Sequence, residues 1–331
     1  MTSAPRRRPP ARRPRAPADR PTVPPIGTIA VDGLAKPHPA IGLGLWGLGR
    51  WKPADEDRTR ATIGRAWERG LRWFDTAEVY GGGRSERLLG EALLKFPAGI
   101  EEAFVVTKVS WEHLRPSQVR ASLVSSLERL ARRSVDLYLV HAPDARVPLA
   151  DTMGALEALR EEGKVGAIGV SNFSVEELEE ASRHLSKARI VVNQIEYNLF
   201  NREDGDAVGD YCRRHGILVE AYSPLARGLL HGRYLDGRRV PAEVERFVHN
   251  LFEPNRRAEV LARARRLRDL AREHDVPLAS IALHWLAARG AAPLVGMSRP
   301  EQVDSNLAAW SARPSDRVLA EADAIARGDR A

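Results

Sequence analysis

The sequence contains almost no cysteine, few aromatic residues and no long apolar run. Cys212 is the only cysteine among 331 residues, which excludes an intrachain disulfide and any metal site built from several cysteines. This cysteine usage is consistent with a reducing, cytoplasmic location. No run of eighteen apolar residues occurs, so we expect no membrane-spanning helix and no membrane partner. With 43% hydrophobic residues, the chain can still bury a large core.

Positive charge is concentrated at one end of the chain. Residues 1–25 contain seven arginines, eight prolines and a single acidic residue, Asp19, and so carry a formal charge of +6 out of the total of +7. Because such a segment cannot bury apolar surface, we predict a disordered Arg/Pro-rich tail over residues 1–25. The segment lacks the apolar region of a signal peptide. A solvated tail without a specific nucleic-acid partner is favoured over one that binds nucleic acid.

Residues 26–331 show one repeating pattern of predicted strands and helices. Apolar centres rich in β-forming residues recur roughly every thirty residues, the length of a strand, a crossover helix and a parallel return strand. They lie near Leu43, Trp73, Val105, Leu139, Ile168, Val192, Val219 and Val295, with helical patterns between them. Eight such units predict a single α/β domain, a closed (β/α)₈ TIM barrel.

Additional elements are predicted at both ends of the barrel domain. Segments 27–31 and 34–38 form an N-terminal hairpin, because Asp32-Gly33 between them is typical of a type I′ turn. The long interval before the last strand is expected to hold a loop over 226–257 and an extra helix over about 258–274. Another helix, 315–327, follows the barrel. Gly42-Leu-Gly-Leu-Trp-Gly47 matches a dinucleotide-binding fingerprint, but no apolar strand precedes it, so we expect glycine to let the first strand bend there.

Polar residues occur where the predicted strands end. Successive strands end at Asp75, Lys108, His141, Ser171 with Asn172, Gln194, Tyr222 with Ser223, and Gly296 with Ser298. In a barrel of this type the carboxyl ends of the strands share one face, and that face carries the active site. The set therefore predicts a functional site at the mouth of the barrel.

Three of these positions form a coherent proton-donating site together with Tyr80. A buried lysine requires an anion, which Asp75 can supply to Lys108. The ammonium is expected to lower the pKa of the phenol of Tyr80, five residues after Asp75. Tyr80 is then a competent general acid for a carbonyl oxygen, to which His141 can donate a second hydrogen bond. Since neither a nucleophile nor a metal set accompanies them, this chemistry suits carbonyl reduction with hydride from a cofactor.

The motifs that surround these residues are specific to one family. GLRWFDTAEVYGGGRSERLLGEAL, FVVTK, VDLYLVHAPD, GVSNF, AYSPLARGLL and GMSRPEQVDSNL make the chain resemble the aldo-keto reductase superfamily from about residue 26 to its last helix. The resemblance implies a barrel that binds a nicotinamide coenzyme across its top and reduces an aldehyde or ketone to an alcohol. It places the catalytic tetrad at Asp75, Tyr80, Lys108 and His141.

The resemblance also implies which residues bind the coenzyme. Ser171, Asn172 and Gln194 would hold the nicotinamide carboxamide, and Tyr222 would stack on the ring. The pyrophosphate would be lined by Ser223, Leu225, Gly228 and Arg233, and the adenosine end by Gly296, Ser298, Arg299, Gln302 and Asn306. Because Pro300 favours a helix start, free amides and Arg299 would attract a 2′-phosphate. NADP(H) is therefore the expected coenzyme, with NAD(H) as the alternative because Ser298 replaces an arginine of many relatives.

The substrate and the partners are less determined by the sequence. Ala142 follows His141 where relatives often carry a bulky aromatic residue, so Trp46 and Trp111 are the expected walls of a substrate pocket for a small carbonyl compound. The oligomeric state is left open. The alternative function is a regulatory subunit of the same fold that binds the coenzyme with little turnover, as some members of the superfamily do.

Overall fold

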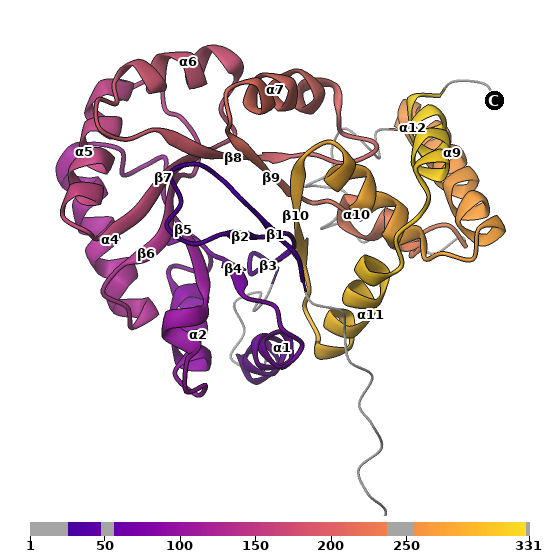
Figure 1. The fold of residues 1–331 in the computed structure, drawn as a ribbon, viewed down its shortest axis with the longest axis horizontal. Helices are drawn as coiled ribbons and strands as arrows, with labels where there is room; N and C mark the ends of the chain where they lie inside the picture. Colours follow the sequence, from indigo (N-terminus) through magenta and orange to yellow (C-terminus); the bar gives the residue numbers. More distant parts are fainter. Residues whose placement is uncertain (1–25, 48–55, 237–253, 329–331) are drawn as a thin grey trace, which may run out of the picture.

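Eight parallel strands form a closed barrel in the computed structural model, which describes residues 26–47, 56–236 and 254–328. Around the barrel the order is β10-β3-β4-β5-β6-β7-β8-β9 (Figure 1). The strands span Gly42–Gly44 (β3), Trp73–Asp75 (β4), Phe104–Val109 (β5), Val135–Val140 (β6), Val165–Ser171 (β7), Ile190–Glu196 (β8), Leu218–Tyr222 (β9) and Ala291–Gly296 (β10). The predicted (β/α)₈ barrel is confirmed. The predicted tail, residues 1–25, lies outside the described residues.

Helices surround the barrel and alternate with its strands (Figure 1). They span Glu56–Glu68 (α1), Arg84–Leu93 (α2), Gly99–Glu102 (α3), Pro116–Leu130 (α4), Leu149–Glu161 (α5), Val175–Arg183 (α6), Glu203–Arg214 (α7), Pro254–Glu273 (α9), Leu278–Ala288 (α10), Pro300–Ser311 (α11) and Asp316–Arg327 (α12). The extra C-terminal helices are confirmed as α9 and α12, which pack against each other. The sequence did not predict α3 or a 3₁₀ segment, η2 (Ala226–His231), inside the expected loop 226–257.

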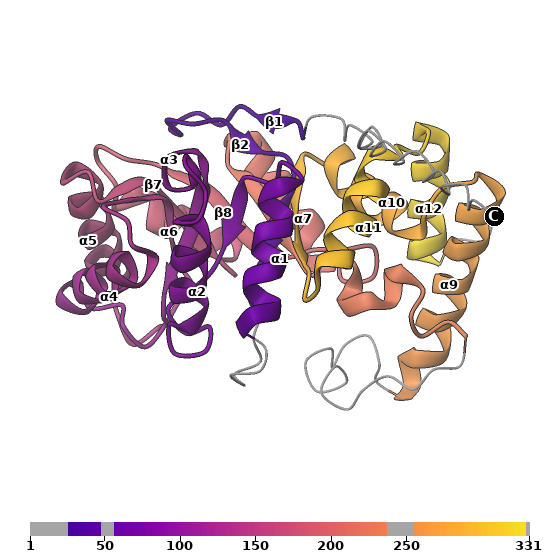
Figure 2. The same cartoon turned by 90° about the horizontal axis from the view of Figure 1, so that it is seen from below.

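A short antiparallel hairpin covers the end of the barrel opposite the strands' carboxyl ends (Figure 2). Its strands are β1 (Thr28–Ile29) and β2 (His38–Pro39), so the predicted hairpin is confirmed, with shorter strands than expected. The predicted type I′ turn is wrong. The Leu34 N–H donates to the Val31 carbonyl at 3.1 Å, but of the two central residues only Gly33 has positive φ, whereas a type I′ turn requires it at both.

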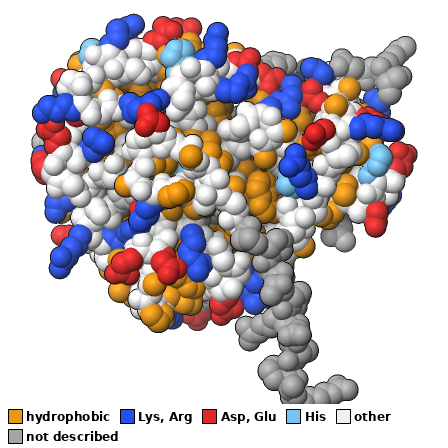
Figure 3. All heavy atoms as spheres, in the orientation of Figure 1, with side chains coloured by type: hydrophobic (Ala, Val, Ile, Leu, Met, Phe, Trp, Pro, Cys, Tyr) orange, Lys and Arg blue, Asp and Glu red, His pale blue; other side chains and the backbone are white. Residues whose placement is uncertain are grey.

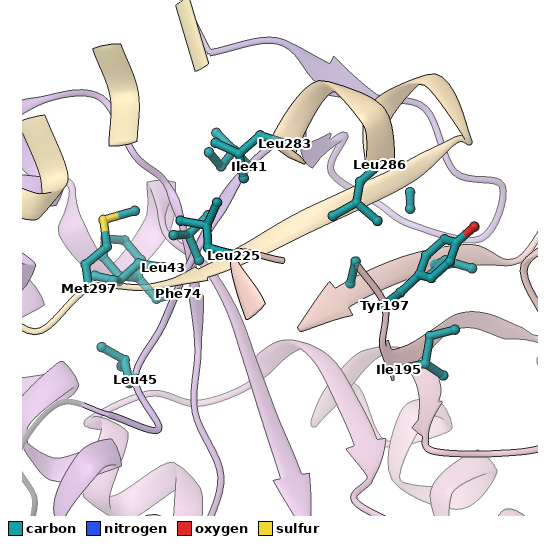
Figure 4. Close-up of a cluster of buried hydrophobic side chains, with 14 of the residues drawn as sticks. Ile41, Leu43, Leu45, Phe74, Ile195, Tyr197, Leu225, Leu283, Leu286 and Met297 are labelled. Carbon is teal, nitrogen blue, oxygen red and sulfur yellow. The ribbon is translucent and has the colours of Figure 1, made fainter. Parts of the chain in front are cut away.

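Two apolar layers lie on either side of the barrel wall because side chains alternate along each strand. The inner layer fills the barrel and includes Trp73, Phe104 and Leu139. The outer layer packs the other face of the strands against the helices, and Figure 4 shows part of it, with Leu43 and Phe74 beside Met297. The interior of the barrel is therefore filled with side chains below its mouth.

The outer surface of the hairpin side carries both signs of charge. Lysine and arginine side chains are interspersed with aspartate and glutamate over this face (Figure 3), and many pair, as Lys36 does with Asp136 at 2.9 Å. Among the described residues, no helix combines the length and apolarity needed to cross a membrane.

Gly42 leaves room for a side chain of the neighbouring strand. A methyl group at Gly42 would come within 2.2 Å of the indole ring of Trp73 on the neighbouring strand. The ring therefore fills the space that a side chain on β3 would occupy.

We predict that Gly42→Ala lowers the free energy of unfolding by about 1–3 kcal/mol, the usual cost of overpacking a core. The measurement is urea-induced unfolding. Gly154→Ala on α5 is the matched control, because no atom lies within 4 Å of the added methyl group; it should be neutral or stabilising by up to ~1 kcal/mol. Parent-like stability of Gly42→Ala would contradict this account of the contact.

Candidate active site

A cavity of about 530 Å³ opens at the carboxyl ends of the barrel strands. Its walls bring together residues from β4, β7, β8, β9 and β10 with others from η2 and α11. Most of the predicted site residues line it, at positions far apart in the sequence.

Asp75 and Lys108 form an ion pair at the bottom of this cavity. The Lys108 ammonium donates to both carboxylate oxygens of Asp75, at 2.7 and 2.8 Å, and to the Thr76 carbonyl at 2.9 Å. It also lies 3.3 Å from the Tyr80 hydroxyl oxygen. Asp75 is 2% exposed and Lys108 is fully buried, so both charges are held inside the protein.

Local sequence explains how Tyr80 reaches the ammonium. After β4 the Thr76 hydroxyl donates to Ser85 Oγ at 2.8 Å, which ties the loop to the start of α2. Between them, Gly81, Gly82 and Gly83 all have positive φ, a conformation that glycine adopts at little cost. The turn folds back tightly and returns the Tyr80 side chain over Asp75 and Lys108.

His141 lies beside Tyr80 directly after β6. Its backbone N–H donates to the Val109 carbonyl at 3.0 Å, which extends the ladder between β5 and β6 by one residue. The two rings meet edge to face, with centroids 5.5 Å apart. The Nδ1 atom is buried without a hydrogen-bond partner among the described residues. A bare lone pair costs less to bury than an unpaired N–H, which favours the tautomer protonated at Nε2.

Burial controls the protonation of these groups. It raises the pKa of Asp75 to about 6, with Lys108 lowering it and Glu220 raising it further. Burial lowers the pKa of His141 to about 3, helped by the charge of Lys108, so the imidazole is neutral at ordinary pH. Burial by itself would lower the pKa of Lys108, but Asp75 and Tyr80 raise it overall.

The pKa of Tyr80 differs from the sequence expectation. Burial raises the pKa of the phenol above its usual value of 10.0, and the opposing effect of Lys108 is smaller. The expected lowering is therefore wrong as a net effect. The reason is that the sequence indicated the ammonium but not how completely the phenol is withdrawn from water. Tyr80 is protonated at neutral pH, the state that a proton donor requires.

Ser171, Asn172, Gln194 and Tyr222 surround the next part of the cavity. Asn172 Nδ2 donates to the His141 carbonyl and to Ser171 Oγ, each at 3.0 Å, while its Oδ1 accepts from the Tyr222 hydroxyl at 3.0 Å. Gln194 Nε2 donates to Asp75 Oδ2 at 2.8 Å. The four side chains are thus held in fixed orientations around the ion pair.

The segment after β9 forms another wall of the cavity. Ser223, Leu225, Gly228 and Arg233 all line it. Ser223 and Arg227 have positive φ, at 53° and 52°, a strained conformation for these residues that is common at functional sites. Arg227 also lines the cavity and lies over the Trp46 ring at 5.1 Å. Two arginines, at 227 and 233, therefore face this part of the cavity.

The far end is formed by β10 and α11. Gly296, Ser298, Gln302 and Asn306 line the cavity there, whereas Arg299 is exposed at the N-cap of α11 and is not among the lining residues. Gln302 Oε1 accepts from the Ser298 backbone N–H at 2.7 Å.

The two predicted tryptophans differ in position. Trp46 lines the cavity and is 39% exposed. Trp111 is 42% exposed and does not line it, but its ring lies edge to face with that of His141, with centroids 5.5 Å apart. Trp46 is thus part of the cavity wall, whereas Trp111 contacts the ring of His141.

Several residues of the site were missed by sequence reasoning. Pro224, Arg227, His231 and Met297 line the cavity, and Glu220 hydrogen-bonds to Gln194 at 2.6 Å. For Glu220 a signal existed, because a carboxylate inside the apolar run ILVEAYS lies two residues before Tyr222, on the same side of the strand. The others follow from loop conformations that no pattern indicated.

Comparison with known proteins identifies the family. The profile of the Aldo/keto reductase family matches residues 40–327, which include all eight strands of the barrel. The chain belongs to this family.

Several relatives of this aldo/keto reductase match over most of their length. It is 30% identical to an NADH-specific methylglyoxal reductase from Escherichia coli, covering 85% of this chain and 94% of that one. A glycerol dehydrogenase from Gluconobacter oxydans has a similar structure, with a TM-score of 0.81 at 30% identity over 90% of this chain and 94% of the other. An aldo-keto reductase from Klebsiella pneumoniae in complex with NADPH has a TM-score of 0.71 at 28% identity, covering 87% and 91%.

We predict that the His141 imidazole of this aldo/keto reductase shows no charge change between about pH 5 and pH 8, because burial lowers its pKa to about 3. The measurement is the ¹⁵N chemical shifts of the ring in the coenzyme-free protein as a function of pH, with the His141→Gln spectrum for assignment. A titration midpoint near the usual value of about 6.5 would contradict the burial of this ring.

Proposed function

We propose that this protein is an NADP(H)-dependent oxidoreductase that reduces aldehyde or ketone groups to alcohols, with Tyr80 as general acid. One observation carries the proposal: a buried ammonium, held by Asp75, contacts the Tyr80 oxygen beside a neutral His141 at the floor of a deep cavity. Membership of the aldo/keto reductase family supports the same reaction class.

The hydrogen bonds of Lys108 direct the proton of Tyr80. An ammonium has three protons and no acceptor, and those of Lys108 go to Asp75, the Thr76 carbonyl and the Tyr80 oxygen. Tyr80 therefore accepts from Lys108, and its own O–H is directed toward the cavity. A carbonyl oxygen placed there would receive that proton, and the ammonium would stabilise the phenolate that remains.

His141 supplies the second donor. Protonated at Nε2 and neutral, it can donate to the same carbonyl oxygen without competing with Tyr80 for the role of acid. The positive charge of Lys108 opposes protonation of the ring. His141 would thus orient the carbonyl group, while Tyr80 transfers the proton.

The chain's own groups fit a nicotinamide coenzyme along the cavity. At the deep end, the Gln194 oxygen and the second lone pair of Asn172 Oδ1, which already accepts from Tyr222, can accept from the N–H donors of a carboxamide. Arg227 and Arg233 line the wall where an anionic pyrophosphate would lie. When bound, the coenzyme supplies the hydride. Tyr222, Ser223, Leu225 and Gly228 would complete the contacts in this part, with Gly296, Ser298, Gln302 and Asn306 at the adenosine end.

A 2′-phosphate would be held at the start of α11. The backbone amides at a helix N-terminus attract anions, and Arg299 at the N-cap of α11 adds a positive charge to this helix start. A solved relative contains NADPH, while another relative is named as NADH-specific. We propose NADP(H) for this chain on the strength of Arg299, with NAD(H) as the alternative.

The basic test is turnover. A panel of aliphatic aldehydes, aromatic aldehydes, ketosteroids and keto-sugars is incubated with the protein and NADPH, and loss of NADPH absorbance is followed. We expect steady turnover of at least one class. Tight NADPH binding without turnover of any of them would instead favour a regulatory, coenzyme-binding protein.

We predict that Tyr80→Phe lowers kcat/KM by about 10²–10⁴-fold, the usual cost of losing a general acid, with NADPH affinity preserved. Lys108→Met should leave residual activity with a shifted pH profile, because the phenol remains but loses the ammonium. Asp75→Asn should lower kcat/KM by an amount between the losses in Tyr80→Phe and Lys108→Met. The measurements are kcat/KM against pH and fluorescence titration with NADPH.

The matched control for this test is Tyr138→Phe. The Tyr138 hydroxyl is also buried, but it has no hydrogen-bond partner among the described residues, so removing it should leave turnover unchanged. Parent-like turnover of Tyr80→Phe would refute the proposed mechanism while leaving the fold intact.

We predict that Arg299→Ala weakens NADPH binding by about 1–3 kcal/mol, the scale of a charge-assisted hydrogen bond. NADH binding should change much less, because NADH lacks the 2′-phosphate. Arg317→Ala, an exposed arginine on α12, is the control and should affect neither. Equal losses for both coenzymes in Arg299→Ala would reject this role of Arg299.

A further inference from the structure

A chain of buried polar side chains runs through the barrel below the proposed active site. His38 Nε2, on the hairpin strand β2, lies 2.9 Å from Glu220 Oε1 on β9. Glu220 Oε2 accepts from Gln194 Nε2 at 2.6 Å, and the same amide donates to Asp75 Oδ2 at 2.8 Å. His38 and Glu220 are both fully buried. The chain thus connects the closed end of the barrel with the Asp75–Lys108 ion pair.

The proposed reduction itself gives no reason for a carboxylate at Glu220. The barrel interior around it is apolar, with Trp73, Leu218 and Ala292 in the same cluster. Burying a second carboxylate close to that of Asp75 is costly, and apolar residues of similar volume are often more stable than a buried ion pair. A role in the site above would account for the charge.

The hydrogen bonds define where one proton must lie. His38 Nδ1 is 2.8 Å from the Pro39 carbonyl oxygen, which can only accept, so Nδ1 carries a hydrogen. Nε2 and Glu220 Oε1, 2.9 Å apart, would repel each other without a proton between them. The His38–Glu220 pair therefore holds one shared proton and is neutral as a unit, which lowers the cost of placing Glu220 near Asp75.

Gln194 transmits the effect of this pair to the cavity. Both of its N–H groups are used, one by Glu220 and one by Asp75, so its side chain is fixed with only the oxygen left to face a ligand. An amide of this kind does not pass protons along. The link between Glu220 and the site is therefore one of orientation and electrostatic field.

We propose that Glu220, neutralised by His38, is a positioning residue that fixes Gln194 and sets the pH range in which the Asp75–Lys108 pair is ionised. This inference rests on the proposed carbonyl reduction. The charged and titratable groups that face Asp75 are Lys108, Tyr80 and, across Gln194, Glu220. Those that face Glu220 are His38 and Asp75. Glu220 contributes to the raised pKa of Asp75, in the direction that the proposal requires.

The decisive variant is Glu220→Gln. A glutamine can accept from Gln194 and donate to a neutral His38, so the hydrogen bonds persist while the negative charge disappears. Glu220 stands between His38 and Gln194, so the negative end of the neutral pair is the end nearer to Asp75. Removing both charges of the pair therefore makes the Asp75 carboxyl easier to ionise. The loss of kcat/KM toward acid pH, which reports Asp75, should then move to lower pH by about half a unit. NADPH affinity should stay within about threefold of the parent.

Glu220→Leu separates orientation from charge. It removes the hydrogen-bond partner of Gln194, so we expect the same shift of the acid limb together with a loss of NADPH affinity of about tenfold, the scale of one lost hydrogen bond. Glu86→Gln is the matched control, since Glu86 is equally buried but bonds to Thr107 and Arg129 outside the barrel interior. Glu86→Gln should not change the pH at which kcat/KM falls on the acid side.

The pair itself is tested without coenzyme or substrate. In the parent protein, His38→Gln should lower the melting temperature by at least about 4 °C, because the buried carboxylate of Glu220 loses its proton partner. In the Glu220→Gln variant, the same change should lower the melting temperature much less. Additive effects would show that the two residues are not paired.

The outcomes distinguish this inference from the proposed function. The inference would be overturned if the acid limb of kcat/KM were unchanged in Glu220→Gln. It would also be overturned if both Glu220 variants lost kcat/KM and coenzyme affinity equally, because Glu220 would then have only a structural role. If no carbonyl substrate is turned over, the proposed function fails first. The positioning of Gln194 would then still be tested by comparing the NADPH affinities of Glu220→Leu and Glu220→Gln. The melting temperatures of the His38 and Glu220 single and double variants would test the pairing of these two residues.

Discussion

The candidate site depends on one interaction, the buried ion pair between Asp75 and Lys108. Removing two charges from water costs several kcal/mol per ion, and the pair is maintained because every proton of the ammonium has an acceptor. One of those acceptors is the phenol oxygen of Tyr80. The same arrangement that satisfies the buried lysine therefore also directs the hydroxyl proton of Tyr80 toward the cavity.

The barrel makes this pair possible by fixing both partners on rigid neighbouring strands. Asp75 is the last residue of β4 and Lys108 lies near the end of β5, and the two strands are hydrogen-bonded in parallel. Below them the barrel is filled by apolar side chains such as Trp73, whose ring occupies the space opposite Gly42, and by the buried pair of Glu220 and His38. Because the space below them is filled, Asp75 and Lys108 can form hydrogen bonds only with each other, with groups at the mouth and with Gln194.

Much of this could be predicted from the sequence because it follows from strand ends. In a parallel barrel the residue that ends each strand lies on one face, so Asp75, Lys108 and His141 could be brought together without coordinates. The direction of the Tyr80 pKa shift could not, since it depends on how deeply the phenol is buried rather than on which charge is near. The turn at Asp32-Gly33 was assigned the wrong type because Asp-Gly is compatible with more than one turn.

Glu220 and His38 illustrate a different limit. The alternation of side chains along β9 places Glu220 on the inner side of the strand, and this position could be predicted from the sequence. Its partner is 182 positions away in the hairpin, and nothing in the local pattern around His38 indicates that its ring enters the barrel from below. Contacts of this kind depend on how the hairpin closes the barrel, which is a property of the whole fold.

The two ends of the cavity are built from different elements, and this separates the proposed chemistry from the choice of coenzyme. At the deep end, the side chains are fixed by barrel strands and by one another. At the far end, the contacts are between loop and helix residues, such as His231 with Asn306 at 2.9 Å and Ser298 with Gln302. Because no barrel strand has to shift when those residues change, selectivity between NADP(H) and NAD(H) can vary while the proton-donating groups keep their geometry.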